Sequence, residues 1–307
     1  MKISKKIIIS GISLALVLTI GLYNIRALKD SFITSPLAEI YVKYLRDGVD
    51  IDADHLVAKM HNGMSIIVNK YDRCVCWFIR IVGYWDSSET KALGNIIKKD
   101  FNVVEVGSNF GVHTLYMADL VGEHGKVYAF EANPNVSKYL KQSVSLNKLE
   151  DRVQVFEMAA SNQNYDGFMV YGVKNIGGGY ILADTAETRD QCKTENCTPI
   201  QVKILDEVLK DKKIDVLKMD AEGSEFWVLE GAKTLLANPK LTLIMEWNTS
   251  HLRRNGVDVN NFIQLLQAEK FQVWSIGRKG KLTPVTYANL ATDAVYDLVL
   301  SRNPSEF

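Results

Sequence analysis

Glycines and an acidic residue stand together in one short stretch of the sequence. Residues 103–111 read Val-Val-Glu-Val-Gly-Ser-Asn-Phe-Gly, which is an apolar run that carries Glu105 and leads to two glycines. Gly107 permits a sharp turn, and Gly111 permits close packing at the start of the helix that residues 112–121 predict. A nucleotide-like molecule fits over such a turn. The Glu105 carboxylate repels phosphate and attracts an amino or sulfonium cation, which favours S-adenosyl-L-methionine over a dinucleotide.

Two further strand ends carry candidate cofactor contacts. Residues 126–130 predict a strand that ends in Glu131, whose carboxylate can accept hydrogen bonds from both ribose hydroxyls. Residues 153–156 predict the next strand, and it runs into Glu157, Met158 and Ala159, where small residues leave room for an adenine ring. The alternative interpretations are a solvated acid at a strand end and an ordinary strand-to-loop transition.

A pair of acids follows a later apolar segment and supplies the candidate catalytic groups. Residues 214–219 predict a buried strand that runs into Asp220 and Glu222, at the sheet edge where open α/β folds bind ligands. A general base assists methyl transfer to an ordinary hydroxyl, and we predict Asp220 for that role, with Glu222 second and His251 third. The alternatives for Asp220 are to orient the acceptor or to cap the following helix. No third ligand beside the two acids is evident, so we predict no metal site.

Alternating strands and helices are needed to position these side chains. Segments of strand length alternate with segments of helical periodicity: strands at 103–106, 126–130, 153–156, 214–219 and 241–245, and helices at 112–121, 135–147, 224–237 and 262–270. This alternation predicts a parallel sheet of right-handed βαβ units. Residues 271–276 and 294–300 are expected to close it as an antiparallel pair.

Residues 165–199 interrupt the alternation. The stretch is rich in glycine and polar residues and has no clear period, so we predict an irregular loop that recognises the acceptor. Cys192 and Cys197 lie in it and could pair in an oxidising compartment.

The part of the chain before the sheet is predicted to cover it. Residues 64–68 and 75–81 are rich in β-formers and predict a hairpin, with Cys74 and Cys76 on opposite faces of a strand. Residues 86–98 predict a helix capped by Ser87 or Ser88.

The N-terminus predicts a membrane anchor. No charged residue occurs between Lys6 and Arg26, and these 19 apolar and small residues, 7–25, are long enough to span a bilayer. A cleaved signal peptide is the alternative, although no clean cleavage site follows. We therefore predict a single-pass membrane protein. The flanking charges leave its orientation open, and the cytosolic side is favoured because S-adenosyl-L-methionine is made there.

The composition argues against polyanionic partners. The chain has 36 acidic and 36 basic residues among 307, so no net positive field favours nucleic acid. We predict no nucleic-acid partner.

Three motifs together resemble those of the FkbM family of S-adenosyl-L-methionine-dependent methyltransferases. They are Val-Glu-Val-Gly-Ser-Asn-Phe-Gly at 104–111, Phe-Glu-Ala-Asn-Pro at 130–134 and Leu-Lys-Met-Asp-Ala-Glu-Gly-Ser-Glu at 217–225. The resemblance covers roughly residues 80–275. It implies a Rossmann-like class I methyltransferase fold, with a mostly parallel seven-stranded sheet and an antiparallel closing strand. It also implies O-methylation of a hydroxyl on a sugar, glycan or secondary metabolite.

The resemblance also assigns residues to the cofactor. It places Glu105, Gly107, Asn109 and Gly111 at the methionine end, Glu131 at the ribose, and Asp220 and Glu222 at the reacting centre. Ala132 stands where the family usually has proline. The predicted organisation is an anchor at 1–29, a linker helix and N-terminal cap at 30–99, and the methyltransferase domain at 100–302. The rival interpretations are a nucleotide-cofactor oxidoreductase and a membrane-anchored binding protein that retains the fold.

Overall fold

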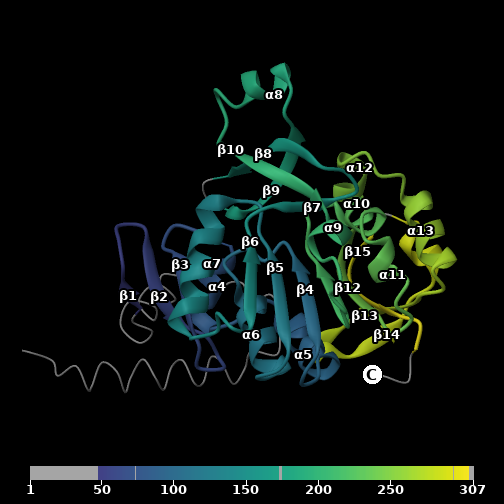
Figure 1. The fold of residues 1–307 in the computed structure, drawn as a ribbon, viewed down its shortest axis with the longest axis horizontal. Helices are drawn as coiled ribbons and strands as arrows, with labels where there is room; N and C mark the ends of the chain where they lie inside the picture. Colours follow the sequence, from purple (N-terminus) through teal and green to yellow (C-terminus); the bar gives the residue numbers. More distant parts are fainter. Residues whose placement is uncertain (1–47, 73, 173–174, 293, 304–307) are drawn as a thin grey trace, which may run out of the picture. The chain divides into compact units, whose positions relative to one another are not determined.

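The computed structural model describes residues 48–72, 74–172, 175–292 and 294–303. Its largest sheet has eight strands in the order β14-β13-β15-β12-β11-β4-β5-β6 (Figure 1). The five strands paired in parallel are β4 (Asn102–Val106), β5 (Lys126–Phe130), β6 (Val153–Phe156), β11 (Val216–Met219) and β12 (Thr242–Asn248). The three others are β13 (Gln272–Ile276), β14 (Leu282–Pro284) and β15 (Val295–Ser301).

The sheet is mixed, as the sequence predicts. β15 lies between β12 and β13 and runs antiparallel to both, which confirms the predicted closing pair. β14 adds an eighth strand to the seven that we expected. It is three residues long and joins β13 through the one-turn helix η1 (Arg278–Gly280), too short a segment to show a period of its own.

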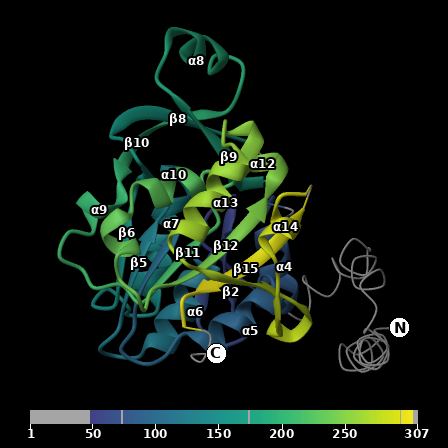
Figure 2. The same cartoon turned by 90° about the vertical axis from the view of Figure 1, so that its right-hand side faces the viewer.

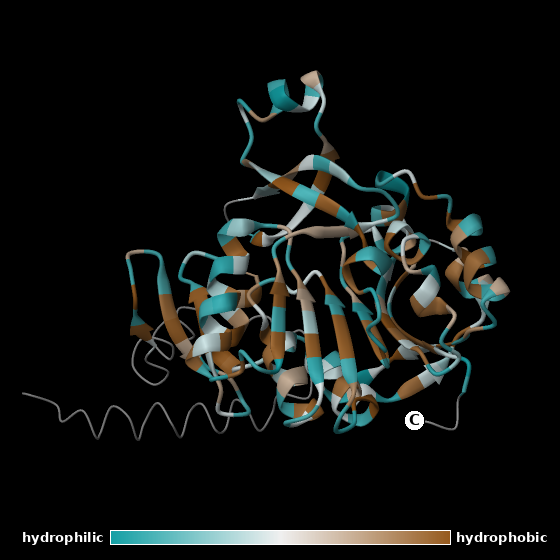
Figure 3. Cartoon of the chain, in the orientation of Figure 1, coloured by the Kyte–Doolittle hydropathy of each residue, from teal (hydrophilic) through white to brown (hydrophobic). Residues whose placement is uncertain are grey.

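Alternating side chains divide the core into two layers, one on each face of the sheet. Val103 packs with the layer formed by β2 (His55–Lys59), β3 (Ser65–Asn69), α4 (Val75–Val82), α5 (Ser87–Ile96), α6 (Val112–Val121) and α7 (Pro134–Leu146). Its neighbour Val104 packs with the opposite layer, formed by α9 (Leu205–Val208), α10 (Glu225–Glu230), α11 (Lys233–Leu236), α12 (Thr249–Arg254), α13 (Val259–Ala268) and α14 (Tyr287–Leu290). Figure 3 shows the resulting hydrophobic bands along the strands. Burial of both strand faces explains their nearly continuous apolar runs.

A second sheet replaces the irregular loop predicted at 165–199, so that prediction is wrong. Its four strands, in the order β7-β10-β8-β9, are β7 (Ala159–Ser161), β10 (Cys197–Ile204), β8 (Tyr165–Gly172) and β9 (Asn175–Ala183). Figure 1 shows this sheet above the upper ends of β4, β5 and β6, with α8 (Ala186–Gln191) at its far tip. Cys192 and Cys197, beside α8, form a disulfide.

Glycines hid β9 from the sequence analysis because they remove the alternation that marks a strand. Close packing requires them: a Cβ on Gly177 would lie 2.0 Å from Asn109 Nδ2, and one on Gly179 would lie 2.3 Å from the Val170 carbonyl oxygen. β9 therefore closes directly onto the glycine turn after β4.

The predicted N-terminal hairpin has the wrong partner strand, because residues 64–68 were expected to pair with residues 75–81. β3 pairs with β2, and β2 also pairs with the short β1 (Val49–Asp50), while residues 75–82 form the helix α4. The carboxylate of Asp72 accepts hydrogen bonds from the backbone N–H groups of Cys74 (3.0 Å) and Cys76 (3.1 Å). This cap starts a helix in a segment whose β-branched residues favour a strand. Cys74 and Cys76 therefore lie at a helix start.

Two other helix boundaries differ from the predictions. Asp86, and neither serine after it, caps α5 by accepting from the N–H groups of Ser88 and Glu89. The single helix predicted at 224–237 is divided into α10 and α11 at Gly231. A Cβ on Gly231 would lie 2.0 Å from the carbonyl oxygen of Ser161 in β7, so contact with the second sheet fixes the break.

The predicted membrane location is not upheld. Over the described ranges, which begin at residue 48, no helix is both long and apolar enough to cross a bilayer. Residues 7–25, on which the prediction depended, lie outside the described residues.

Candidate active site

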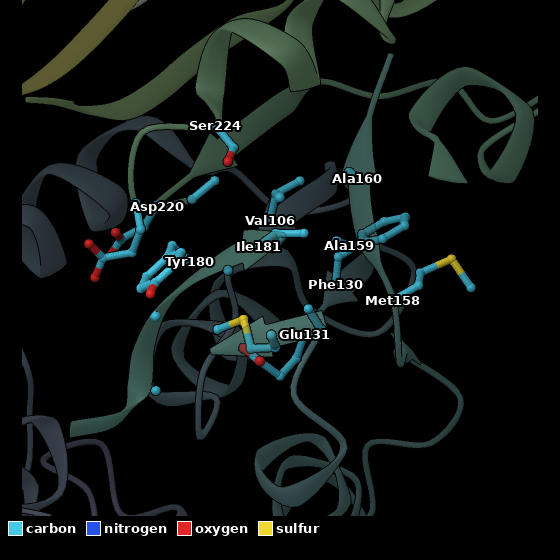
Figure 4. A pocket seen from close by; sticks show the side chains of 17 residues that line it. Val106, Phe130, Glu131, Met158, Ala159, Ala160, Tyr180, Ile181, Asp220 and Ser224 are labelled. Atoms are coloured by element: carbon cyan, nitrogen blue, oxygen red, sulfur yellow. The ribbon is translucent and has the colours of Figure 1, made fainter. Parts of the chain in front are cut away.

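Two neighbouring cavities lie at the ends of β4, β5 and β11. The first is lined mainly by Phe130, Glu131, Met158, Ala159, Tyr180, Asp220 and Glu222, and Figure 4 shows most of these side chains around it. The second is lined mainly by Trp85, Glu105, Asn109, His113, Lys218, Asp220 and Glu222. Gly107, Gly177, Asp220 and Glu222 line both cavities, so the two form adjoining parts of one site.

The glycine turn is shaped by its neighbours. Gly107 has φ +85°, and a Cβ there would lie 1.9 Å from the Asp220 carbonyl oxygen, so only glycine lets the turns after β4 and β11 touch. Gly111 has φ +92° and packs against Leu140 of α7. Asn109 also has a positive φ of 51°, and its side-chain oxygen accepts from the N–H of Phe110. The turn predicted from sequence is therefore present and tightly held.

Glu131 holds this turn as well as facing the first cavity. Its Oε2 accepts from the N–H of Asn109 (2.7 Å), and its Oε1 accepts from the N–H of Asn133 (2.8 Å). Burial raises the pKa of Glu131 to about 7, although these two backbone hydrogen bonds lower it. Each carboxylate oxygen still has a lone pair for a ligand hydroxyl.

Glu105 lies in a buried ion network beneath the second cavity. Its Oε2 accepts from Thr114 Oγ1 (2.5 Å), and its Oε1 lies 3.7 Å from Nζ of Lys218, which is also 3.4 Å from Oε1 of Glu89. Burial raises the pKa of Glu105 to about 7 despite the opposing charge of Lys218. Burial would lower the pKa of Lys218, but Glu89 and Glu105 raise it above its usual value. The lysine is therefore held charged between the two acids.

His113 completes the network as a neutral imidazole. Its Nδ1 is 3.4 Å from Glu89 Oε2, and its Nε2 is 3.3 Å from the carbonyl oxygen of Trp85. Burial, assisted by the charge of Lys218, lowers its pKa to about 3. The sequence analysis did not select Lys218. Its position could have indicated a role, because a charged residue inside an otherwise apolar strand needs a buried partner.

Asp220 has the least constrained carboxylate of the site. Within the described part of the chain, its side chain makes no hydrogen bond, and Asp220 lines both cavities. Figure 4 shows it at the edge of the first. Burial raises its pKa, although the charge of Lys218 opposes the shift. A carboxylate held in this way is more basic than an ordinary aspartate.

Glu222 and His251 lie side by side and are joined by Glu246 from β12. Nδ1 of His251 is 3.2 Å from Oε2 of Glu222 and 3.6 Å from Oε2 of Glu246. This nitrogen is buried, yet no acceptor or donor in the described chain has hydrogen-bonding geometry with it. Burial and the charge of Asp220 raise the pKa of Glu246 to about 8, whereas burial and Arg254 lower that of His251. Sequence analysis placed Glu246 at a strand end without counting it in the site.

A family model decides the identity of the chain. The model of the methyltransferase FkbM domain matches residues 105–273, which is more than half of the chain. The matched range includes the three motifs of the sequence analysis, apart from Val104 at the start of the first motif. The chain belongs to the FkbM methyltransferase family.

The FkbM chain is also similar to several solved structures. One is a methyltransferase FkbM from Methylobacillus flagellatus (13% identity over 76% of this chain and 55% of that chain, TM-score 0.41). A second is a putative transferase from Pyrococcus horikoshii (16% identity, 86% and 80% coverage, TM-score 0.45). A third is an O-methyltransferase from Bacillus cereus in complex with SAH (17% identity, 70% and 80% coverage, TM-score 0.41). No curated protein matches the chain.

One predicted cofactor contact of this FkbM methyltransferase lies apart from the others. Glu157 accepts from Ser137 Oγ (2.5 Å) and from Lys141 Nζ (2.9 Å), both on α7. It lines neither of the two joined cavities, but a third one beside Ala132. Ala159, by contrast, lines the first cavity.

Glu225 supports the turn that carries the FkbM Asp220, and its burial predicts a pH effect on stability. Its Oε1 accepts from the N–H groups of Ala221 (2.9 Å) and Gly223 (3.3 Å). Burial raises its pKa from 4.5 to about 7, outweighing the backbone hydrogen bonds. The protonated side chain therefore stabilises the fold fully below pH 4.5, and this contribution is lost as pH rises through 7.

Glu225→Gln keeps the acceptor and removes the ionisation. Relative to this variant, we expect the parent to lose on the order of 1–3 kcal/mol of unfolding free energy between pH 5 and 8. Urea unfolding at several pH values measures the difference. Glu230→Gln, at the partly exposed end of the same helix, is the matched control. Parallel pH curves for the parent and Glu225→Gln would contradict the expectation.

Proposed function

We propose that this methyltransferase uses S-adenosyl-L-methionine to methylate a hydroxyl of a sugar, a glycan or another small acceptor. The observation that carries the proposal is the Asp220 carboxylate, which faces both cavities without a hydrogen bond from the rest of the described chain. A free, basic carboxylate at the junction of two cavities is what proton removal from an acceptor hydroxyl requires.

The first cavity suits the adenosine part of the cofactor. Met158 and Ala159 provide an apolar wall for the adenine ring, and Glu131 can accept from the ribose hydroxyls. The second cavity suits the methionine part, because Glu105 and Asp220 attract its ammonium group and Lys218 attracts its carboxylate. The residues shared by both cavities then lie beside the sulfonium centre.

The reaction needs an in-line displacement at the methyl carbon. The acceptor oxygen forms a bond to the methyl group as the carbon–sulfur bond breaks, and the bonding pair leaves with sulfur in S-adenosylhomocysteine. Asp220 takes the hydroxyl proton. Holding the acceptor oxygen behind the methyl group supplies much of the rate, since positioning alone is worth several kcal/mol.

The second sheet is the segment proposed to recognise the acceptor. Tyr180 of β9 lines the first cavity, and its ring centroid lies 5.7 Å from the guanidinium carbon of Arg254 in α12. Figure 2 shows α12 and β9 side by side. The second sheet extends from the candidate catalytic residues toward α8. An acceptor can be held against it, outside the two cofactor cavities.

Calorimetric titration with S-adenosyl-L-methionine tests the cofactor assignment. Glu131→Ala is expected to weaken binding by about 1.5–3 kcal/mol, because it removes charge-assisted hydrogen bonds to the ribose. Glu150→Ala, which removes an exposed carboxylate bonded to Ser145, is the control and should bind as the parent does. Equal affinity of the parent and Glu131→Ala would refute the ribose assignment. Methyl-group mass gains on glycans or metabolites incubated with the enzyme would then identify the acceptor.

A further inference from the structure

Three potential metal ligands converge at one corner of the site. One carboxylate oxygen each from Glu222 and Glu246 and a ring nitrogen of His251 all lie within 4.8 Å of one another. The two nitrogen–oxygen distances are 3.2 and 3.6 Å. Ligands bound at about 2.0–2.2 Å to one ion lie roughly 3–4 Å apart, so small side-chain shifts would bring these atoms to an ion.

The histidine nitrogen gives an independent sign of a missing partner. Nδ1 of His251 is buried, faces both carboxylates and makes no hydrogen bond within the described residues. Buried polar atoms are nearly always paired, and the lone pair of this nitrogen, if it faces the two carboxylates as a neutral imidazole, is available to a metal ion.

The charge around the group also favours a cation. Besides burial, four carboxyl groups act on Glu246 and raise its pKa, those of Asp220, Glu222, Glu225 and Asp297. Arg254 is close, but its described hydrogen bond goes to the backbone carbonyl of Glu222, and its guanidinium lies over Tyr180. A divalent ion bound between Glu222 and Glu246 would offset part of the cost of burying these acids.

The backbone holds the ligands in place before any ion arrives. Asn255 Nδ2 donates to the carbonyl oxygens of Glu222 (2.8 Å) and His251 (3.1 Å). Gly223 has φ +98°, and a Cβ there would lie 2.4 Å from the His251 backbone, so the turn packs against α12 without space for a side chain. β11 and β12 are adjacent parallel strands, which brings the turn after β11 next to Glu246. Ligands on such fixed elements lose little entropy on binding.

We propose that Glu222, Glu246 and His251 bind a divalent first-row metal ion at the edge of the acceptor site. A mixed set of one imidazole and two carboxylates suits Mn²⁺ or Zn²⁺ better than the oxygen-seeking Ca²⁺. Three protein ligands leave positions for substrate oxygens. Because Glu222 also lines both cavities, the ion can bind the acceptor hydroxyl, lower its pKa and direct its proton to Asp220. Metal binding itself is independent of the proposed function, whereas this role in turnover rests on it.

Electron paramagnetic resonance of Mn²⁺ added to the metal-stripped full chain tests the site. Binding removes the sharp signal of free Mn²⁺, so a titration gives the affinity and stoichiometry. We expect one site in the parent and an affinity at least tenfold lower in Glu246→Gln and in His251→Gln, because even outer-shell changes cost 10–100-fold. Glu230→Gln keeps the same chemistry outside the group and should match the parent. Unchanged affinity in both ligand variants would overturn the proposal.

A second measurement needs no variant. Spin-echo modulation from an imidazole nitrogen is expected in the parent with Mn²⁺ bound, and its absence would exclude His251 as a ligand even if a variant failed to fold. Titration of the same preparations with S-adenosyl-L-methionine separates the two proposals. Metal binding without cofactor binding would refute the proposed function alone, and cofactor binding without metal binding would refute the metal site alone.

Discussion

Asp220→Asn is expected to lower the turnover number by roughly 10²- to 10⁴-fold, the usual loss when a general base is removed. Asparagine keeps the shape of the side chain but cannot take the acceptor proton. The affinity for S-adenosyl-L-methionine should fall by a smaller factor than the turnover number, because Asp220 supplies only one of the proposed contacts to the cofactor. Initial rates of S-adenosylhomocysteine formation, measured at saturating acceptor, give the effect.

Asp151→Asn is the control for this experiment, since Asp151 is exposed at the start of β6, away from both cavities. Its rate should equal that of the parent. If Asp220→Asn also turns over at the parental rate, Asp220 is not the base, and Glu222 or His251 becomes the candidate. Glu222→Gln and His251→Gln, each assayed alone, then show which of the two acts.

Lys218→Met should destabilise the fold by about 3–5 kcal/mol, because removal of one partner leaves charge buried without compensation. Nζ of Lys218 is the cation between Glu89 and Glu105, and its side chain is 1% exposed. Methionine matches its length but not its charge. Urea unfolding at pH 8 measures the loss. The loss should shrink as the pH falls, since burial raises the pKa of both glutamates and protonation removes their uncompensated charge.

Lys233→Met provides the matched comparison. Lys233 pairs with Glu230 at 3.9 Å with 74% of its side chain exposed, and such pairs contribute about 0–1 kcal/mol. A loss below about 1 kcal/mol in Lys218→Met at pH 8 would mean that Glu89 and Glu105 are already neutral in the folded protein. The buried network would then be held by hydrogen bonds rather than by charge.

The central strands could be predicted from the sequence because the pattern that marks them lies within each segment. β4, β5 and β11 are buried on both faces, so each is a mostly apolar run, and each is followed by a glycine or an acid at the sheet edge where ligands bind. The helix α6 was predicted with its observed bounds because the glycine turn marks its start.

Features that depend on distant contacts could not be predicted in this way. The glycines of β9 carry no strand signal, and their meaning appears only when Asn109 is placed against Gly177. α4 depends on a cap from Asp72, which competes with strand-forming residues. Glu246 became a site residue only when the pairing of β11 with β12 brought it beside Glu222 and His251. The periodicity of a short segment does not reveal contacts between residues that are far apart in the sequence.

The chain leaves the main fold to form the second sheet, and it returns close to where it left. β7 pairs in parallel with β10, with Ser161 opposite Ile204, so the 42 residues between them form an excursion whose two ends are neighbours. Its replacement would have to keep Met169, Tyr180 and Ile181, because these residues line the first cavity. The contacts of Gly177 with Asn109 and of the Ile176 backbone with Asn133 and Asp72 would also have to be retained. Under the proposed function, exchange of the remaining residues of the excursion would change the acceptor and leave the contacts to the cofactor in place.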